Sequence, residues 1–138
     1  MSHKISINQL SDTIMSELNI MEQDVIDHVN KASKKVAASE AKSLRATSPV
    51  RSDGYSRKYP PGSYARSWTQ KVTGSHLGVE NRTVYNSKHY QIAHLLEHGH
   101  VIVTNGKRYG SSRAIEHIAP VEEAGNIAFE QEIRGMKL

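Results

Sequence analysis

The segment HYQIAHLLEHGH (residues 89–100) contains four histidines and one glutamate around two leucines. Imidazole groups are common ligands of transition metals, and they also transfer protons near neutral pH. His94 and His98 have the i, i+4 spacing that places two ligands on one face of a helix. His100 and His117 are further histidines that would complete such a site. A metal centre held by histidines is therefore one interpretation of this segment.

Acid–base catalysis is a second interpretation, because Glu97 is adjacent to His98. The metalloprotease motif H-E-x-x-H needs a glutamate directly after its first histidine, where this chain has Leu95. The chain has no cysteine, which excludes a thiolate-bound zinc and the zinc deaminase pattern. It also lacks a nucleophile elbow and a glycine-rich phosphate loop. We therefore expect no enzyme activity, no cofactor and no native metal site.

A surface that docks another protein is the third interpretation. On a helix over residues 88–98, four polar side chains fall on one face: Tyr90, His94, Glu97 and His98. Three aliphatic side chains fall on the opposite face and anchor the helix: Ile92, Leu95 and Leu96. Gly99 has the freedom to end this helix in the left-handed conformation. The polar face is then free to meet a partner, and we favour this interpretation over catalysis.

A long helix is predicted at the N-terminal end, over residues 1–46. Its apolar residues recur with helical steps of three and four: Leu10, Ile14, Leu18, Met21, Val25, Val29, Ala32 and Val36. Ser6 and Gln9 form a capping-box pattern at its start, and Pro49 limits its end. Such a helix is about 60 Å long, which exceeds the width of a small domain. We expect a bend near residues 30–33 and contact with a neighbouring molecule.

The rest of the chain alternates loops, short strands and helices. We expect first a mobile basic loop (47–66) and then an antiparallel hairpin of strands 67–72 and 76–86, with a turn at 73–75. The short helix follows, and after it come a third strand (100–104) that joins the hairpin and a second basic loop (105–117). The last element is a helix from Pro120 to Arg134, followed by Gly135.

These segments predict a single α+β domain of 138 residues, with helices on one face of a small antiparallel sheet. The long N-terminal helix comes first, the short helix is inserted in the sheet, and the C-terminal helix packs on one face. With one tryptophan and one phenylalanine, the core is expected to be small and aliphatic. Its predicted members are Val25, Val29, Trp68, Val72, Leu77, Val79, Ile92, Leu95, Leu96, Ile102, Ile127 and Phe129.

Composition narrows the cellular setting. The chain has no run of some 18 apolar residues, so we expect no membrane span and no membrane partner. Its first ten residues, MSHKISINQL, lack the apolar stretch of a signal peptide, and there is no cysteine to form a disulfide. We therefore expect the protein to be made and used on the cytoplasmic side.

Charge is distributed unevenly along the chain. Residues 1–30 carry one lysine and five acids, whereas residues 31–71 carry ten basic and two acidic side chains. Residues 113–138 are again acidic, with three basic and five acidic side chains. A basic belt between acidic ends suits either contact with a polyanion such as DNA or head-to-tail packing of copies.

Several motifs together resemble a known family. These are VYN (84–86), HLLEHGH (94–100), the basic loop NGKRYGSSR (105–113) and HIAP (117–120), which follow SPVRSDGY and YARSW upstream. In this order they are similar to the phage tail-component family typified by gene product ten of phage Hong Kong 97. The resemblance covers nearly the whole chain. The link RSDGYSRKYPPGSYAR is longer than is usual in that family, and Ser52 stands where threonine is common.

The resemblance implies a structural protein of the neck or tail-completion type, with no established enzyme activity. Such proteins form rings at the head–tail junction or at the head-proximal end of the tail. We therefore expect a homo-oligomeric ring, six- or twelve-fold, located in the virion after assembly in the host cytoplasm. Other neck, connector or tail-tube proteins are its expected partners, with non-specific DNA contact in a channel.

The expected contact residues outside the subunit are the polar helix face, His100, His117 and four loop cations: Arg57, Lys58, Lys107 and Arg108. Two other functions stay open from the sequence. One is a DNA-binding accessory protein that uses the basic belt over residues 31–71. The other is a metal protein centred on His94 and His98.

Overall fold

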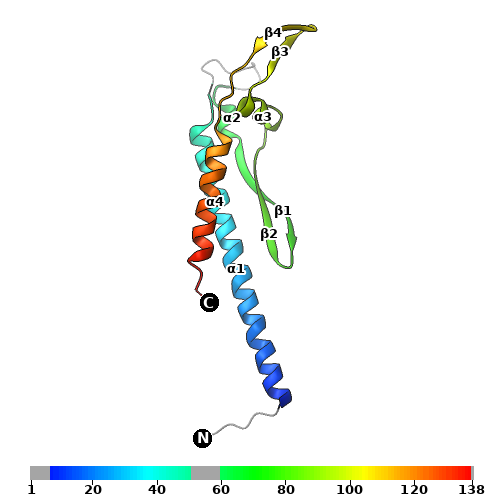
Figure 1. Cartoon of the computed structure of the whole chain (residues 1–138), viewed down its shortest axis with the longest axis vertical. Coiled ribbons are helices and arrows are strands. Elements are labelled where there is room, and N and C mark those ends of the chain that lie inside the picture. The colour runs from blue at the N-terminus through cyan, green and yellow to red at the C-terminus, as the bar shows by residue number, and fades with distance from the viewer. Residues whose placement is uncertain (1–6, 51–59, 138) are drawn as a thin grey trace.

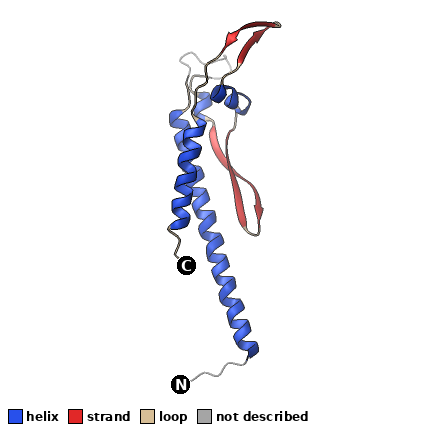
Figure 2. Cartoon of the chain, viewed as in Figure 1, coloured by secondary structure: helices blue, strands red, loops and turns tan. Residues whose placement is uncertain are grey.

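The computed structural model describes residues 7–50 and 60–137 (Figure 1). Its elements are α1 (Ile7–Thr47), α2 (Ser63–Arg66), β1 (Trp68–His76), β2 (Val79–Asn86), α3 (Tyr90–His98), β3 (Val101–Thr104), β4 (Lys107–Ser111) and α4 (Ile118–Arg134). Helices and antiparallel strand pairs occupy separate parts of the chain (Figure 2), so the predicted α+β class is confirmed. Ser6, Arg57 and Lys58 lie outside the described residues, as do residues 51–59 of the loop predicted to be mobile. That prediction is wrong over Ser63–Arg66, which form the largely buried helix α2.

One continuous helix of 41 residues, α1, forms the long axis of the molecule (Figure 1). The predicted bend near residues 30–33 is therefore wrong. No proline or glycine occurs within α1, and sharp kinks need such a residue or an inserted group. The helix ends just before Pro49, where the Ser48 amide still donates to the Leu44 carbonyl at 2.9 Å.

Within residues 7–50 and 60–137, only the C-terminal part of α1 is covered by other elements. Every residue from 8 to 24 is exposed, and this segment, which we call the stalk, extends past the first hairpin and the end of α4 (Figure 1). Beyond the stalk, side chains of α1 bond to other elements. His28 Nε2 donates to the Glu132 carbonyl at 3.0 Å. The Asn30 side chain donates to the Gly78 carbonyl and accepts the Glu80 amide hydrogen, at 2.9 Å each.

The predicted first hairpin is confirmed, but its turn lies elsewhere. Strands β1 and β2 pair from Trp68 opposite Asn86 to His76 opposite Val79. The turn therefore consists of Leu77 and Gly78, whose φ angles are 52° and 84°. Positive φ at both positions of a two-residue turn matches the twist of the strands. The predicted turn at 73–75 is instead an irregularity between Val72 and Gly74 within a continuing strand.

A second hairpin replaces two predicted features. Strand β3 pairs with β4 and not with the first hairpin, so the predicted joining of strand 100–104 to that hairpin is wrong. The predicted basic loop (105–117) is likewise wrong over Lys107–Ser111. The turn is Asn105–Gly106, with φ angles of 52° and 76°. Asn-Gly between strands is a strong hairpin signal, which the sequence interpretation passed over.

Helix α4 ends before Gly135 as predicted, but it begins at Ile118, two residues before the predicted start at Pro120, which lies in its first turn. It packs along α1, and α1 in turn contacts both strands of the first hairpin. An ion pair between Lys35 and Glu132 links the two helices. Gly125 allows a close approach, because any side chain there would overlap the carboxylate of Glu40.

The core lies at the end of α1 that meets α2 and α3. Its buried cluster is Leu44, Tyr64, Trp68 and Val121, with Val84, Ile92, Ala93, Leu96 and Ile118 packed against it. The predicted core is confirmed at Trp68, whereas Val72, Leu77 and Ile127 are exposed. Three alanines, Ala32, Ala37 and Ala41, are among the most deeply buried residues of α1, together with Leu44.

The turn of the first hairpin generates a stability prediction. Leu77 is 78% exposed and has positive φ, a conformation that costs a non-glycine residue about 1 kcal/mol. Asparagine tolerates this conformation, so Leu77→Asn is expected to raise the free energy of unfolding by about 0.5 kcal/mol. Urea unfolding followed by circular dichroism measures the shift. Leu77→Val is the control and should lower stability, because β-branched residues resist positive φ. Equal midpoints for all three proteins would contradict a strained turn.

Candidate functional site

The glutamate of the histidine-rich segment is buried inside the subunit. Glu97 on α3 is only 6% exposed, and its carboxylate accepts the amide hydrogens of His117, Ile118 and Ala119 at 2.6, 2.9 and 2.8 Å. These are the first amides of α4, which have no partner within their own helix. The prediction that Glu97 lies on a free polar face is therefore wrong. Glu97 caps the start of α4.

The environment of Glu97 favours its charged form. Burial raises the pKa of this carboxyl, whereas the three backbone amides and nearby His117 lower it, and the net result is a pKa below the ordinary value. The positive end of the α4 dipole acts in the same direction. Glu97 is thus a fixed anion that joins α3 to α4.

His117 is also buried, at 4% exposure, so its predicted place on an outer contact surface is wrong. Its Nδ1 lies 2.7 Å from the Ile115 carbonyl and 3.1 Å from a Glu97 oxygen. Because a carbonyl only accepts, Nδ1 carries a hydrogen, and Nε2 is hydrogen-bonded to the Tyr64 hydroxyl at 2.8 Å. The Tyr64 ring also packs edge-on against Trp68, with centroids 5.7 Å apart.

A second buried group extends this network to the first hairpin. Asn86, at the end of β2, is 2% exposed, and its side chain donates to the Tyr64 carbonyl at 2.8 Å. The Asn86 oxygen accepts the His89 amide at 2.8 Å, which starts α3. The His89 ring pairs with the Ser63 hydroxyl at 2.9 Å. Burial, and secondarily Lys88, lowers the pKa of His89, so its ring stays neutral at pH 7.

We call Tyr64, Asn86, His89, Glu97 and His117 the polar cluster. Sequence reasoning missed the roles of Tyr64, Asn86 and His89. One signal was present for Asn86: an asparagine at a strand end, three residues before a helix, commonly bonds a backbone amide at the helix start. No local pattern indicated Tyr64 or His89, because their partners come from distant segments.

The side chains of the polar cluster are arranged in sequence, as in a proton relay, from Tyr64 through His117 to Glu97. Its electrostatics oppose nucleophilic catalysis, because burial, and then the Glu97 charge, raises the pKa of Tyr64. A catalytic nucleophile needs the opposite shift. What the cluster does is hold α2, β2, α3 and α4 in fixed relative positions.

The other predicted contact residues are exposed but dispersed. Tyr90, His94 and His98 lie on the outer side of α3, and Lys107 and Arg108 lie on β4. Within residues 7–50 and 60–137, no group of three His, Cys, Asp or Glu side chains is placed to hold a metal ion.

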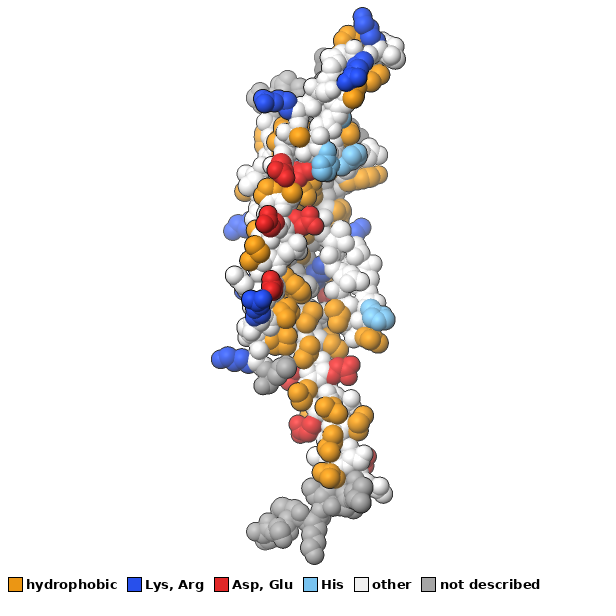
Figure 3. Space-filling view, in the orientation of Figure 1, with side chains coloured by type: hydrophobic (Ala, Val, Ile, Leu, Met, Phe, Trp, Pro, Cys, Tyr) orange, Lys and Arg blue, Asp and Glu red, His pale blue; other side chains and the backbone are white. Residues whose placement is uncertain are grey.

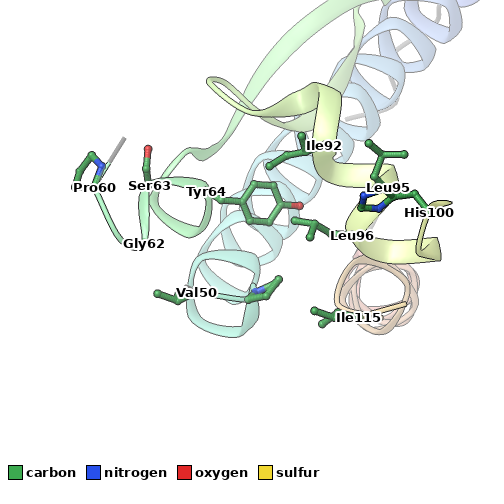
Figure 4. A pocket seen from close by; sticks show the side chains of 11 residues that line it. Val50, Pro60, Gly62, Ser63, Tyr64, Ile92, Leu95, Leu96, His100 and Ile115 are labelled. Carbon is green, nitrogen blue, oxygen red and sulfur yellow. The ribbon is translucent and has the colours of Figure 1, made fainter. Parts of the chain in front are cut away.

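A cavity of about 440 Å³ lies beside the polar cluster (Figure 4). Its lining comes from the end of α1, from α2 and α3, and from the segment before α4: Pro49, Val50, Pro60, Gly62, Ser63, Tyr64, Ile92, Leu95, Leu96, His100 and Ile115. Predicted contact residue His100 therefore borders this cavity, where its Nδ1 lies 2.8 Å from the Ser112 hydroxyl. Most of the lining is apolar, as in sites that bind apolar groups.

Comparisons of the chain with protein-family models, with curated proteins and with solved structures gave no match. Among the helices of the described segments, none has the length and apolar character needed to cross a bilayer.

The cap on α4 generates the next prediction. Glu97→Gln keeps one acceptor but places an NH₂ group against backbone donors, so we expect the free energy of unfolding to fall by about 2 kcal/mol. Urea unfolding measures the change. Glu116→Gln is the matched control, since Glu116 is exposed and close in sequence to the same helix start, and it should change stability little. Equal losses in the two variants would contradict the capping role.

Stability should also fall in two steps on acidification. The folded pKa of His89 lies below its ordinary 6.5, so its contribution is present above pH 6.5 and is lost as the pH falls through the folded pKa. The folded pKa of Glu97 lies below 4.5, so its contribution is lost only below pH 4.5. Urea titrations between pH 7.5 and 3 test this, and Glu97→Gln should flatten only the lower step. An unchanged pH profile in that variant would refute the assignment.

Proposed function

We propose that this chain is a structural protein of a bacteriophage or prophage, of the neck or tail-completion type. It assembles as a homo-oligomeric ring at the head–tail junction or at the head-proximal end of the tail, and it catalyses no reaction. The motif order VYN, HLLEHGH, HIAP supports the phage assignment through its resemblance to the tail-component family.

The observation that carries the assembly role is the uncovered stalk. Leu10, Ile14, Leu18 and Met21 form a stripe on one side of it, and each is 47–51% exposed. Hydrophobic side chains follow the stalk with acidic side chains beside them (Figure 3). Contiguous apolar surface of this kind typically marks a protein–protein contact. A subunit whose longest helix leaves its apolar face in water is therefore best explained as part of an oligomer.

The polar cluster supports the same role from the other end of the molecule. It fixes the helices with buried hydrogen bonds, while Tyr90, His94 and His98 stay exposed on α3. Such exposed polar groups suit contacts that set orientation between ring proteins. Virion location, and connector or tail-tube proteins as partners, follow from the resemblance.

Light scattering over a concentration series tests the assembly role. We expect oligomers of defined mass in the wild type, and ring-shaped particles in electron micrographs. Leu18→Asp should weaken association by roughly 30-fold or more, the effect of losing a central contact residue. Ile20→Asp is the control, because Ile20 is 54% exposed on the same stalk but lies off the stripe. A wild type that is monomeric at every concentration would reject this function.

DNA binding is the alternative function, and the same samples test it. Several basic-belt residues already have partners inside the subunit: Lys35 pairs with Glu132, and Arg45 donates to the Trp68 carbonyl at 2.8 Å. We therefore expect only weak duplex binding near 50 mM salt. Tight binding with a steep loss on adding salt would favour the DNA-binding function instead.

A further inference from the structure

The cavity beside the polar cluster offers an apolar surface. The side chains of Val50, Ile92, Leu95, Leu96 and Ile115 border it (Figure 4). Two hydroxyl groups in its wall already have partners, since Ser63 bonds His89 and Tyr64 bonds His117. A polar small molecule would have to compete for these groups. Apolar side chains would need no such partners.

The stalk presents side chains of the matching kind. Its stripe is separated by four, four and three residues, which puts Leu10, Ile14, Leu18 and Met21 on one face over about 16 Å. The same face continues into Val36, which is buried within the subunit. An amphipathic helix with this spacing is the usual partner of an apolar groove.

Charge distinguishes among the surfaces that this stripe could meet. The stalk carries Asp12, Glu17, Glu22 and Asp24 and has no lysine or arginine. Pairing two stalks would bring these acids together. The segment 99–115, of which His100 and Ile115 line the cavity, carries three cations and no acid. Arg66 adds a fourth cation, and its guanidinium donates at 3.0 Å to the carbonyl of Pro61, which lies between the lining residues Pro60 and Gly62.

We infer that the stalk of one copy docks its apolar stripe in the cavity of the next copy. This inference rests on the proposed function and specifies the contact between subunits. Stalk and cavity lie at opposite ends of the molecule (Figure 1), so one subunit cannot fill its own cavity. The contact joins two different surfaces, and such contacts build rings when the rotation between neighbours closes.

A mixing experiment tests the contact. Leu18→Asp damages the stalk and leaves the cavity intact, whereas Ile115→Asp damages the cavity, at a residue that is 46% exposed, and leaves the stalk intact. Each variant alone should remain monomeric. Their equimolar mixture should form a dimer that contains one molecule of each variant, because the intact stalk of Ile115→Asp can dock in the intact cavity of Leu18→Asp. Native mass spectrometry with one variant isotopically labelled resolves this species.

The controls separate the inference from the proposed function. Val72→Asp matches the exposure of Ile115 but lies outside the cavity, and it should associate as the wild type does. If the wild type associates and Ile115→Asp associates equally well, the inference is overturned and the ring proposal still stands. Two monomeric variants that form no mixed dimer would also overturn it. A wild type that never associates would overturn both.

Cysteine cross-linking keeps the test valid if Ile115→Asp does not fold. The chain has no cysteine, so each introduced thiol reports one contact. Leu18→Cys mixed with Ile115→Cys should give disulfide-linked dimers on mild oxidation, and Ile20→Cys with Ile115→Cys should give at least tenfold fewer. Dimers of Leu18→Cys alone would indicate paired stalks and contradict the inference.

Discussion

The length of α1 is the constraint on which the rest of the structure depends. Its 41 residues extend about 60 Å, whereas α4 and the first hairpin cover it only beyond residue 24. The same apolar stripe runs through the covered and uncovered parts, and among the described residues nothing covers its exposed part, which the proposed ring would bury against a second molecule. The subunit is therefore organised as a packed end and a projecting end, and the proposed assembly would make use of this asymmetry.

The packed end is held together by buried hydrogen bonds as well as by apolar contacts. Three backbone amides at the start of α4 would be left without partners there if Glu97 were absent. Through His117 the same carboxylate reaches Tyr64, which lines the cavity. The histidine-rich segment that suggested chemistry from its composition is thus divided. Glu97 and His89 work inside the fold, and His94 and His98 remain on the surface.

Local patterns predicted most of the fold. Apolar periodicity located α1, the start and stop signals Pro120 and Gly135 located α4, and strand alternation predicted the first hairpin. The prediction of a bend in α1 was wrong because the width of a domain does not limit a helix that projects beyond the packed part of its subunit. The site was less predictable. Glutamate is seldom buried, and the partners of Glu97 lie 20 to 22 residues away.

Hydrogen exchange in the stalk, measured by mass spectrometry on dilute and concentrated protein, is the most direct test of this account. A helical segment whose residues are all exposed, as in the stalk, opens easily. Amides of residues 8–24 should therefore exchange rapidly in dilute monomer and become protected as oligomers form, while those of α4 change little. Equal stalk protection at both concentrations, or oligomers whose stalks still exchange rapidly, would contradict the claim that subunits assemble by covering this helix.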